Sequence, residues 1–427
     1  SHVAKGKEED GSKFASWYDW KENAMRAPSH RVLALLRGEE AGVLRVHVMP
    51  DDDTQAIEML TRQFVRGRGE ASQQVGMAVA DGYKRLLQPS IENDLRATLK
   101  ERADREAIRV FADNLRQLLL ASPLGQKRTL AIDPGFRTGC KVVCLDAQGK
   151  LEHNETIYPF TSVREERAAI SKLEALVEAF DIEAIAIGNG TAGRETEEVV
   201  KRCHFDRKVI AVMVSESGAS VYSASDVARR EFPDYDVTVR GAVSIGRRLM
   251  DPLSELVKID PKSIGVGQYQ HDVDQKMLQA SLQDVVVSCV NSVGVELNTA
   301  SRELLSYVSG IGPALADKIV SYRNQQGAFH NRRELMKVER MGDKSFEQCA
   351  GFLRIRESDN PLDRSAVHPE RYDVVQRMAE SVGATVEQLM SDKTLRDKID
   401  IRQFVSDDCG LPTLQDVMHE LEKPGLD

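Results

Sequence analysis

A short glycine-containing turn between two apolar segments is the feature that most constrains the fold of this chain. Gly310-Ile311-Gly312 follows Leu304-Leu305-x-x-Val308 and precedes an apolar pattern that continues through Ala316 and Ile319. The glycines permit positive φ and a close approach of the backbone to another molecule. The apolar spacing fits two helices locked against each other about a corner that Ile311 anchors. The sequence therefore predicts a helix-hairpin-helix motif.

A second copy of this pattern follows between Leu335 and Gly342. Its first glycine position is occupied by Arg340. L residues resist the left-handed conformation that glycine adopts freely. We therefore expect the second hairpin to pack well but to present its amides less freely, which makes it mainly structural.

The first hairpin predicts contact with a nucleic-acid backbone. Backbone amides at a turn and the positive end of the following helix favour an anion. Contacts of this kind hold phosphates without reading bases. An ordinary helix cap and turn is the alternative interpretation. The residues predicted to form the contact are Gly310, Ile311, Gly312, Lys318, Arg323 and Arg340.

The charge distribution supports a local rather than a global anion-binding surface. The net charge of the 427-residue chain is −9, which argues against a uniformly basic nucleic-acid binder. Between Ser301 and Arg356, however, the sequence contains ten lysines and arginines but only six acidic residues. This asymmetry is typical of a phosphate-binding surface within an acidic protein.

A segment with a different texture runs from Arg128 to about residue 260. Short apolar runs rich in β-formers alternate with helical patterns in its later part. A hairpin followed by strand–helix–strand units predicts a mixed sheet. The expected strands are Thr129–Asp133, Lys141–Leu145, Ala184–Ile187 and Lys208–Val214, and the expected helices are Val163–Phe180 and Arg194–Cys203.

The rest of the chain is expected to be helical, which gives a multidomain, mainly α protein with one α/β domain. The expected helical stretches include 51–87, 91–120 and a long helix at 277–295, and a polar linker at 357–361 precedes a last helical segment at 369–422. The predicted domains are a helical region (1–127), the α/β domain (128–260), the long helix with tandem hairpins (261–356) and a C-terminal helical domain (357–427).

Apolar runs and cysteine spacing indicate in which cellular compartment the chain is expected to occur. No apolar run approaches the about 20 residues that span a bilayer, and no secretory signal is evident, so we expect a cytoplasmic protein without membrane contact. The six cysteines are scattered without metal-ligand spacing. We therefore expect reduced thiols and neither a structural metal nor a cofactor.

The string Ala131-Ile132-Asp133-Pro134-Gly135 resembles the first strand of the RNase H-like fold, in its resolvase and YqgF branch. Active members bind two metal ions through three or four carboxylates. The resemblance offers Asp133 and Glu216 as acids, with Gly188-Asn189 at a third position and Arg240 at the last. We therefore expect a catalytically degenerate domain in which Arg240 brings positive charge to the metal position. The alternative is a metal-dependent, resolvase-like nuclease that uses the two acids.

Taken in order, these features resemble the Tex family of bacterial transcription accessory proteins. Two further strings carry the resemblance, Val214–Ser223 and Asn360–Tyr372. The family combines helical regions, a YqgF domain, tandem helix-hairpin-helix motifs and a C-terminal S1 RNA-binding barrel. No barrel pattern follows the last expected helix here, so we expect a core fragment that binds RNA more weakly than an intact member.

The resemblance and the motifs together predict a non-catalytic transcription accessory factor that binds RNA or DNA backbone without sequence preference. RNA polymerase or other transcription machinery is a further expected partner, and we expect a monomer. A protein-interaction platform, in which the hairpins serve only for packing, is the second alternative beside the nuclease.

Overall fold

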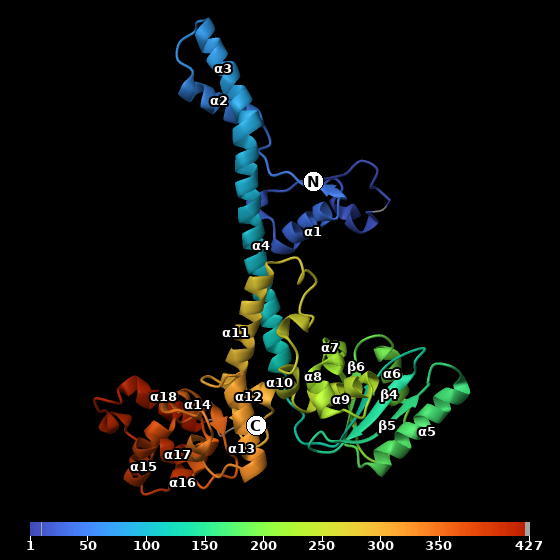
Figure 1. Ribbon diagram of the computed structural model, residues 1–427, viewed down its shortest axis with the longest axis vertical. Helices are drawn as coiled ribbons and strands as arrows, with labels where there is room; N and C mark the ends of the chain where they lie inside the picture. Colours follow the sequence, from blue (N-terminus) through green and yellow to red (C-terminus); the bar gives the residue numbers. More distant parts are fainter. Residues whose placement is uncertain (10, 423–427) are drawn as a thin grey trace. The chain divides into compact units, whose positions relative to one another are not determined.

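The computed structural model describes residues 1–9 and 11–422 (Figure 1). These residues are mainly helical and form two compact units. The first unit contains Ser1–Asn114 and Gly265–Ser281, and the second contains Leu115–Ile264 and the chain from Leu282 onward. One five-stranded mixed sheet lies in the second unit. The predicted fold class, mainly α with one α/β domain, is confirmed.

Helices dominate the first unit after its first 28 residues. The helices are α1 (Ser29–Glu40), α2 (Asp53–Phe64), α3 (Glu70–Gly82), a π-helical turn (Tyr83–Leu87) and α4 (Gln88–Leu119), of which the last residues belong to the second unit. The expectation of helix from residue 1 is wrong at the start. Two short 3-10 turns and a two-stranded sheet, β1 (His2–Val3) with β2 (Leu44–Arg45), surround a small core that contains Phe14 and Leu44 there.

The helical stretch predicted over 51–87 is divided between α2 and α3. Gly67 adopts φ +88°, which lies outside the helical region. Ser72 Oγ donates a hydrogen bond to the carbonyl oxygen of Arg66 over 2.7 Å and so fixes the connecting loop. Within the described residues, no helix is both long and apolar enough to cross a membrane.

The sheet of the second unit has the strand order β5-β4-β3-β6-β7. Its strands are β3 (Thr129–Asp133), β4 (Cys140–Leu145), β5 (Leu151–Ile157), β6 (Ala184–Gly188) and β7 (Ile210–Val214). β3 and β5 both pair antiparallel with β4, whereas β6 runs parallel to β3 and β7. The sequence pattern did not reveal β5, because this edge strand carries the polar sequence LEHNETI.

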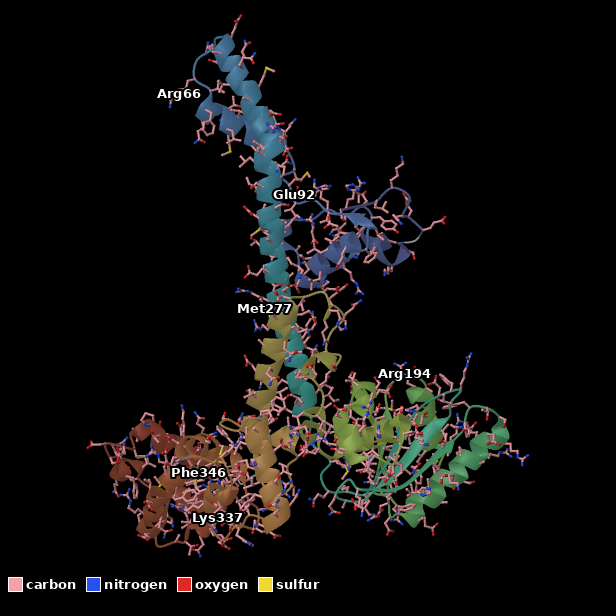
Figure 2. The ribbon with its side chains drawn as sticks, in the orientation of Figure 1. Arg66, Glu92, Arg194, Met277, Lys337 and Phe346 are labelled. Atoms are coloured by element: carbon pink, nitrogen blue, oxygen red, sulfur yellow. The ribbon has the colours of Figure 1, made fainter. Side chains whose placement is uncertain are left out.

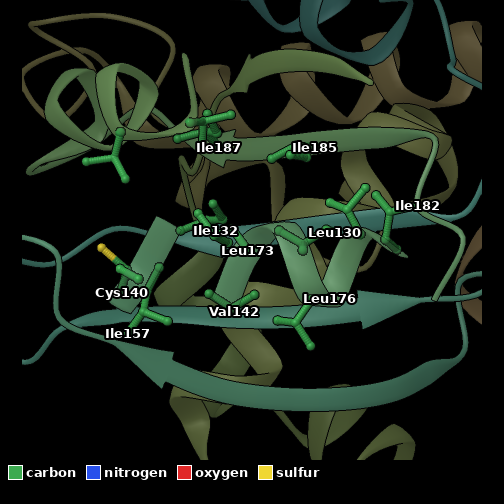
Figure 3. Packing of buried hydrophobic residues seen from close by; sticks show 14 of the residues in the cluster. Leu130, Ile132, Cys140, Val142, Ile157, Leu173, Leu176, Ile182, Ile185 and Ile187 are labelled. Atoms are coloured by element: carbon green, nitrogen blue, oxygen red, sulfur yellow. The ribbon is translucent and has the colours of Figure 1, made fainter. Parts of the chain in front are cut away.

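Helices cover both faces of this sheet. On one face, α5 (Val163–Ala179) packs Leu173 and Leu176 against side chains that include Leu130 and Ile132 (Figure 3). On the other face, α9 (Val237–Met250) packs against the alternate residues, such as Ala131. α6 (Gly193–Lys201) follows β6, and three short helices flank α9: α7 (Ala219–Ala224), α8 (Asp226–Glu231) and α10 (Pro252–Leu256).

The chain after the α/β part forms the tandem hairpins and a final group of helices. The elements of the hairpins are α11 (Gln275–Val293), α12 (Arg302–Leu305), α13 (Pro313–Gln326), a 3-10 helix (Arg332–Lys337) and α14 (Asp343–Cys349), with β8 (Val295–Glu296) parallel to β9 (Leu353–Arg354). The last group comprises α15 (Tyr372–Ser381), α16 (Val386–Ser391), α17 (Lys393–Asp397) and α18 (Leu411–Glu422).

The segment predicted as a polar linker, 357–361, is held in place by a buried arginine network. The Arg332 side chain is 1% exposed, and its guanidinium donates to the carbonyl oxygens of Leu353, Val367 and Ser365. Its backbone N–H donates to the buried carboxylate of Asp363 over 3.1 Å, and Ser358 Oγ, within the segment 357–361, donates to the same carboxylate oxygen over 2.6 Å. The hairpins and the last helices are therefore packed together in the second unit rather than joined by a free tether.

Candidate nucleic-acid interface and an acidic pocket

The first hairpin has the geometry that its sequence predicts. The five apolar positions that lock α12 to α13 are all buried: Leu304, Leu305, Val308, Ala316 and Ile319. Ile311 is 4% exposed, and its N–H donates to the carbonyl oxygen of Val308 over 3.0 Å. Gly310 adopts φ +81°. The turn therefore places its middle residue in the core and Gly312 at the start of α13.

The start of α13 is open to solvent. Gly312 is the N-cap of the helix, with φ −93° and ψ 176°, and no side chain among the described residues caps it. Pro313 occupies the first helical position and has no N–H, so the donors of the first turn are those of Ala314 and Leu315. A Cβ atom added at Gly312 would meet nothing within 4 Å. The helix thus begins with unused donors beside an unobstructed surface.

Packing as well as conformation requires glycine at position 310. A Cβ atom there would lie 2.7 Å from Cβ of Gln348 and 3.1 Å from the carbonyl oxygen of Ser345. Both residues belong to α14 of the second hairpin. The turn of the first hairpin therefore packs closely against α14 of the second hairpin.

The second hairpin reproduces the turn of the first. Arg340 adopts φ +70°, and Gly342 caps α14 with φ −92° and ψ 171°. Met341 N–H donates to the carbonyl oxygen of Val338 over 3.1 Å, as Ile311 does to Val308. The second hairpin was expected to present its amides less freely because of Arg340. The structure differs, because the exposed Arg340 side chain leaves the backbone free to follow the same path, and no described side chain caps α14. The two hairpins differ in charge instead, since Asp343 occupies the first position of α14.

The three predicted basic contacts lie in different environments. Lys318 Nζ lies 2.9 Å from Glu339 Oε2, in an exposed ion pair between the two hairpins. Arg323 is half-buried and donates to the carbonyl oxygens of Leu297 and Ala300, each over 2.9 Å. Burial lowers the pKa of its guanidinium. Arg340 is exposed. The Arg323 guanidinium is therefore turned toward the protein itself and is engaged there by backbone carbonyls.

The charge excess counted between residues 301 and 356 is not all at the surface. Arg332 and Arg354 are buried and donate to backbone carbonyls, and Arg302 pairs with Asp317 over 2.8 Å. Of the cations in this window that are fully exposed, Arg333, Lys337, Arg340 and Lys344 belong to the second hairpin, and Arg356 follows it. Lys337 is labelled in Figure 2. The start of α14 is open as well, since no described side chain caps it and a Cβ atom at Gly342 would meet nothing within 4 Å. Both hairpins thus offer open amides, and the second also offers most of the accessible positive charge.

A third turn of related form, between α15 and α16, was not foreseen from the sequence. Gly383 adopts φ +65°, and Thr385 caps α16. Here Gln388 N–H donates to Thr385 Oγ1 over 3.2 Å, and Thr385 N–H donates to Gln388 Oε1 over 3.0 Å. This capping box satisfies donors at the start of α16, whereas the corresponding donors of α13 in the first hairpin have no side-chain partner among the described residues. The string Gly383-Ala384-Thr385 with Gln388 three residues after the cap is the signal that could have revealed it.

Asp133 and Glu216, the two acids expected in the α/β domain, line one cavity of about 260 Å³. Burial, and secondarily the charge of Glu216, raises the pKa of Asp133 to about 6. Glu216 fills much of the space beside β6, since Cβ atoms added at Gly188 and Gly190 would lie 2.4 and 1.5 Å from its carboxylate oxygens. One of these oxygens is buried and has no hydrogen-bond partner among the described residues.

Arg240 does not bring its charge to this cavity, contrary to expectation. Its guanidinium is buried and donates to the carbonyl oxygens of Phe232 and Ser223. Gly241 faces the acid instead, because a Cβ atom there would lie 3.6 Å from Asp133 Oδ2. Successive side chains of a helix point about 100° apart. The residue that faces Asp133 is therefore Gly241, one position after the Arg240 that the sequence comparison had indicated.

Arg248 positions the loop that carries Glu216. Its Nη1 donates to the carbonyl oxygens of Ser215 and Ser217 over 2.9 and 2.7 Å. Nothing in the local sequence indicated this role, because the contact joins α9 to a loop about 30 residues earlier. In the described part of the chain, no three His, Cys, Asp or Glu side chains are grouped so that they could hold a metal ion.

Comparison with known families divides the chain into four matched segments. Residues 1–111 match the Tex central region-like family, and residues 127–250 match the Tex protein YqgF-like domain. Residues 290–354 match a helix-hairpin-helix motif, and residues 360–427 match a further HHH domain. The segment expected only to be helical is thus a second domain of the hairpin type.

Curated relatives match the chain from end to end. Protein tex of Bordetella pertussis is 48% identical over all of this chain and 56% of its own length. Transcriptional accessory protein Tex of Neisseria gonorrhoeae is 46% identical over all of this chain and 57% of its own length. S1 RNA-binding domain-containing protein 1 of Homo sapiens is 35% identical over 89% of this chain and 44% of its own length. The chain therefore spans little more than half of these bacterial relatives, and it belongs to the Tex family.

Proposed function

We propose that this chain is a non-catalytic nucleic-acid-binding factor in transcription that holds the phosphate backbone of RNA or DNA through its first hairpin. The observation that carries the proposal is the open start of α13, where Gly312 leaves the helix without a side-chain cap and without a neighbour above it. Free amides and the helix dipole together favour a phosphate at such a point.

The second hairpin supplies charge to the same interface. Exposed Lys337, Arg340 and Lys344 lie on this hairpin. Its α14 packs against the first turn at Gly310. Cations beside the amides strengthen a phosphate contact without adding base specificity. We therefore expect affinity that falls steeply with salt and depends little on sequence.

Two relatives give this proposal its biological setting. The Neisseria gonorrhoeae relative is named a transcriptional accessory protein, and the human relative is named for an RNA-binding domain. We propose the same setting for this chain, with nucleic acid as its first partner and the transcription machinery as its second.

The decisive experiment replaces the open N-cap with one that carries its own anion. Gly312→Asp suits the local backbone and is expected to cap α13, raising the free energy of unfolding by about a few tenths of a kcal/mol. The new carboxylate would occupy the phosphate position, and affinity for a fluorescent oligonucleotide should fall about tenfold, which corresponds to one lost charge-assisted hydrogen bond.

Two controls accompany this variant. Gly312→Asn offers a neutral cap of the same shape and should weaken binding less than Gly312→Asp. Ala168→Asp adds the same charge at an exposed position of α5 and should leave affinity nearly unchanged. A stabilised Gly312→Asp variant that binds as tightly as the wild type would exclude the first hairpin as the contact.

We further propose that the α/β domain performs no two-metal hydrolysis. Among the described residues that line its cavity, Asp133 and Glu216 alone are acidic; the others are Ala219, Ser220, Ser223, Val237, Thr238 and Gly241. Two metal ions need more acidic ligands than Asp133 and Glu216 provide. Cleavage of branched or single-stranded substrates in Mg²⁺ or Mn²⁺ that disappears in Asp133→Asn would overturn this part of the proposal.

A further inference from the structure

The last turn of α2 and the loop that joins it to α3 carry an unusual group of exposed side chains. Phe64 is 58% exposed, and Arg62, Arg66 and Arg68 on either side of it are exposed as well. No acidic residue occurs from Met59 to Gly69, although the chain as a whole is acidic. Figure 1 shows the loop at the end of the α2–α3 pair, and Figure 2 labels Arg66 there.

The backbone of this loop is fixed by its own hydrogen bonds. Val65 N–H donates to the carbonyl oxygen of Thr61 over 2.9 Å at the end of α2. Ser72 Oγ donates to the carbonyl oxygen of Arg66 over 2.7 Å, and Gly67 turns the chain with φ +88°. The aromatic ring and the guanidinium groups therefore project from a defined turn.

These side chains make few contacts with the rest of the described chain. Arg66 and Arg68 form no ion pair or side-chain hydrogen bond with any residue that the structure describes, and Arg62 lies only within 3.7 Å of exposed Glu58. The ring of Phe64 stacks on no other described aromatic ring. The exposed ring and the guanidinium groups of Arg66 and Arg68 are therefore accessible to a ligand.

We propose that the loop Arg62–Gly69, termed the arginine loop, binds single-stranded nucleic acid. A base would stack on the Phe64 ring, and the arginines on either side would hold the adjacent phosphates. Stacking on an aromatic ring combined with backbone contacts from basic side chains is the general chemistry of sequence-tolerant single-strand binding. Arginine suits the role because its planar guanidinium binds phosphate through two parallel hydrogen bonds.

This site is separate from the hairpin interface and goes beyond the function proposed above. It belongs to the first compact unit, whereas the hairpins belong to the second. It needs unstacked bases, which a duplex does not offer, while the open amides at Gly312 need only a phosphate. The arginine loop therefore selects single strands.

A protein partner is the competing occupant, since Met59 and Met77 are also exposed on these helices. The arrangement of charge favours nucleic acid, because the arginines flank one ring and no acid interrupts them. The two occupants also differ in what they require at position 64. Stacking requires an aromatic ring, whereas an apolar protein contact is also satisfied by leucine.

The first arm of the test places a reporter at position 64. Phe64→Trp keeps a ring for stacking, and its fluorescence should be quenched by an oligo(dT) or oligo(U) of about 15 nucleotides, a length within the usual site sizes. The wild-type chain contains only Trp17 and Trp20, so its titration with the same oligonucleotide gives the background that is subtracted from the Phe64→Trp signal. Phe64→Leu should lose affinity about fivefold or more, and Phe64→Trp should keep it.

The second arm tests the charge. Arg66→Glu/Arg68→Glu should reduce the slope of log affinity against log salt by about 0.7 for each lost phosphate contact. Lys84→Glu/Arg109→Glu makes the same change in net charge at exposed positions of the same unit and is the matched control. It should leave the slope nearly unchanged. Circular dichroism checks that all four variants keep the wild-type helix content.

Each outcome supports or overturns the proposal separately from the hairpin proposal. Quenching of Phe64→Trp that persists when Gly312→Asp is added supports an independent loop site. Absence of quenching, or equal affinities for Phe64→Leu and Phe64→Trp, overturns it even if Gly312→Asp alone abolishes binding. Equal losses in the loop pair and in its control would show a general effect of net charge and would also overturn it.

Discussion

Gly310 and Arg340 adopt the same left-handed backbone conformation, with φ of 81° and 70°, at equivalent positions of consecutive hairpins. One position carries glycine and the other a large L side chain, so the conformation comes from the hairpin rather than from glycine alone. The two positions differ in whether the surroundings leave room for a side chain. At position 310 a Cβ atom would press against α14, whereas the Arg340 side chain points into solvent.

Replacing Arg340 with glycine should stabilise the protein. A non-glycine residue in the left-handed region costs about 1 kcal/mol, and Arg340→Gly removes that cost without leaving a cavity. Urea denaturation should show a gain of about this size. Arg340→Ala removes the same cation but keeps the strained backbone, so it should not gain stability, while both variants should bind nucleic acid slightly more weakly. An equal gain in both variants would show that the conformation carries no strain.

Replacing Gly310 with alanine should be strongly destabilising. The new Cβ atom would stand 2.7 Å from Cβ of Gln348 on a backbone with φ +81°. We expect the free energy of unfolding to fall by about 2–4 kcal/mol from overpacking and conformational strain together. Gly342→Ala is the matched control, because its φ is −92° and its Cβ would meet nothing within 4 Å. The prediction fails if the two variants unfold at the same urea concentration.

Removal of the Arg332 guanidinium should loosen the packing between the hairpins and the last helices. Arg332→Met would leave the carbonyl oxygens of Leu353, Ser365 and Val367 buried without their donor. The expected loss is about 3–5 kcal/mol, as for other broken buried polar networks. Arg333→Met, at the exposed neighbouring position, should change stability by less than about 0.5 kcal/mol. A small loss for Arg332→Met would mean that water replaces the guanidinium.

The buried carboxyl of Asp133 should make stability depend on pH. Burial raises its pKa from 3.8 to about 6, so the folded chain binds more protons than the unfolded chain between these values. The free energy of unfolding therefore falls as pH rises through this window, and the cost is fully present above it. Asp133→Asn removes the ionisable group.

We expect Asp133→Asn to match the wild type at pH 4 and to be more stable by about 2–3 kcal/mol at pH 7, at about 1.4 kcal/mol for each unit of pKa. Urea denaturation at both pH values measures the difference. Asp408→Asn, at an exposed position, should show no such dependence. A gain for Asp133→Asn that is the same at pH 4 and pH 7 would contradict a raised pKa.

The helix-hairpin-helix motif and most of the mixed sheet could be predicted because their signals are local. Apolar spacing around Gly310-Ile311-Gly312 and the short β-rich runs from Thr129 to Val214 depend on neighbouring residues. The edge strand β5 escaped prediction because an edge needs few apolar residues. The start of the chain was wrongly expected to be helical, because tertiary packing around Phe14 overrides a weak helical pattern there.

The candidate sites were predicted less completely than the fold. Their residue types could be found, since Asp133 and Glu216 do line one cavity. The direction of each side chain could not be found. Arg240 and Arg323, both expected to present charge, donate to backbone carbonyls inside the protein instead. A count of charges along the chain does not tell which ones reach the surface, because burial is decided by residues distant in sequence.

The sequence by itself determined most of the helices and strands, where the turns of the tandem hairpins lie and which family the chain resembles, because periodicity and turn chemistry act over a few residues. Only the tertiary structure decided that Arg340 follows the path of a glycine, that most of the exposed cations lie on the second hairpin, and that Arg66 and Arg68 remain unpaired among the described residues. These outcomes depend on long-range packing, which fixes the direction of each side chain and the partners available to it.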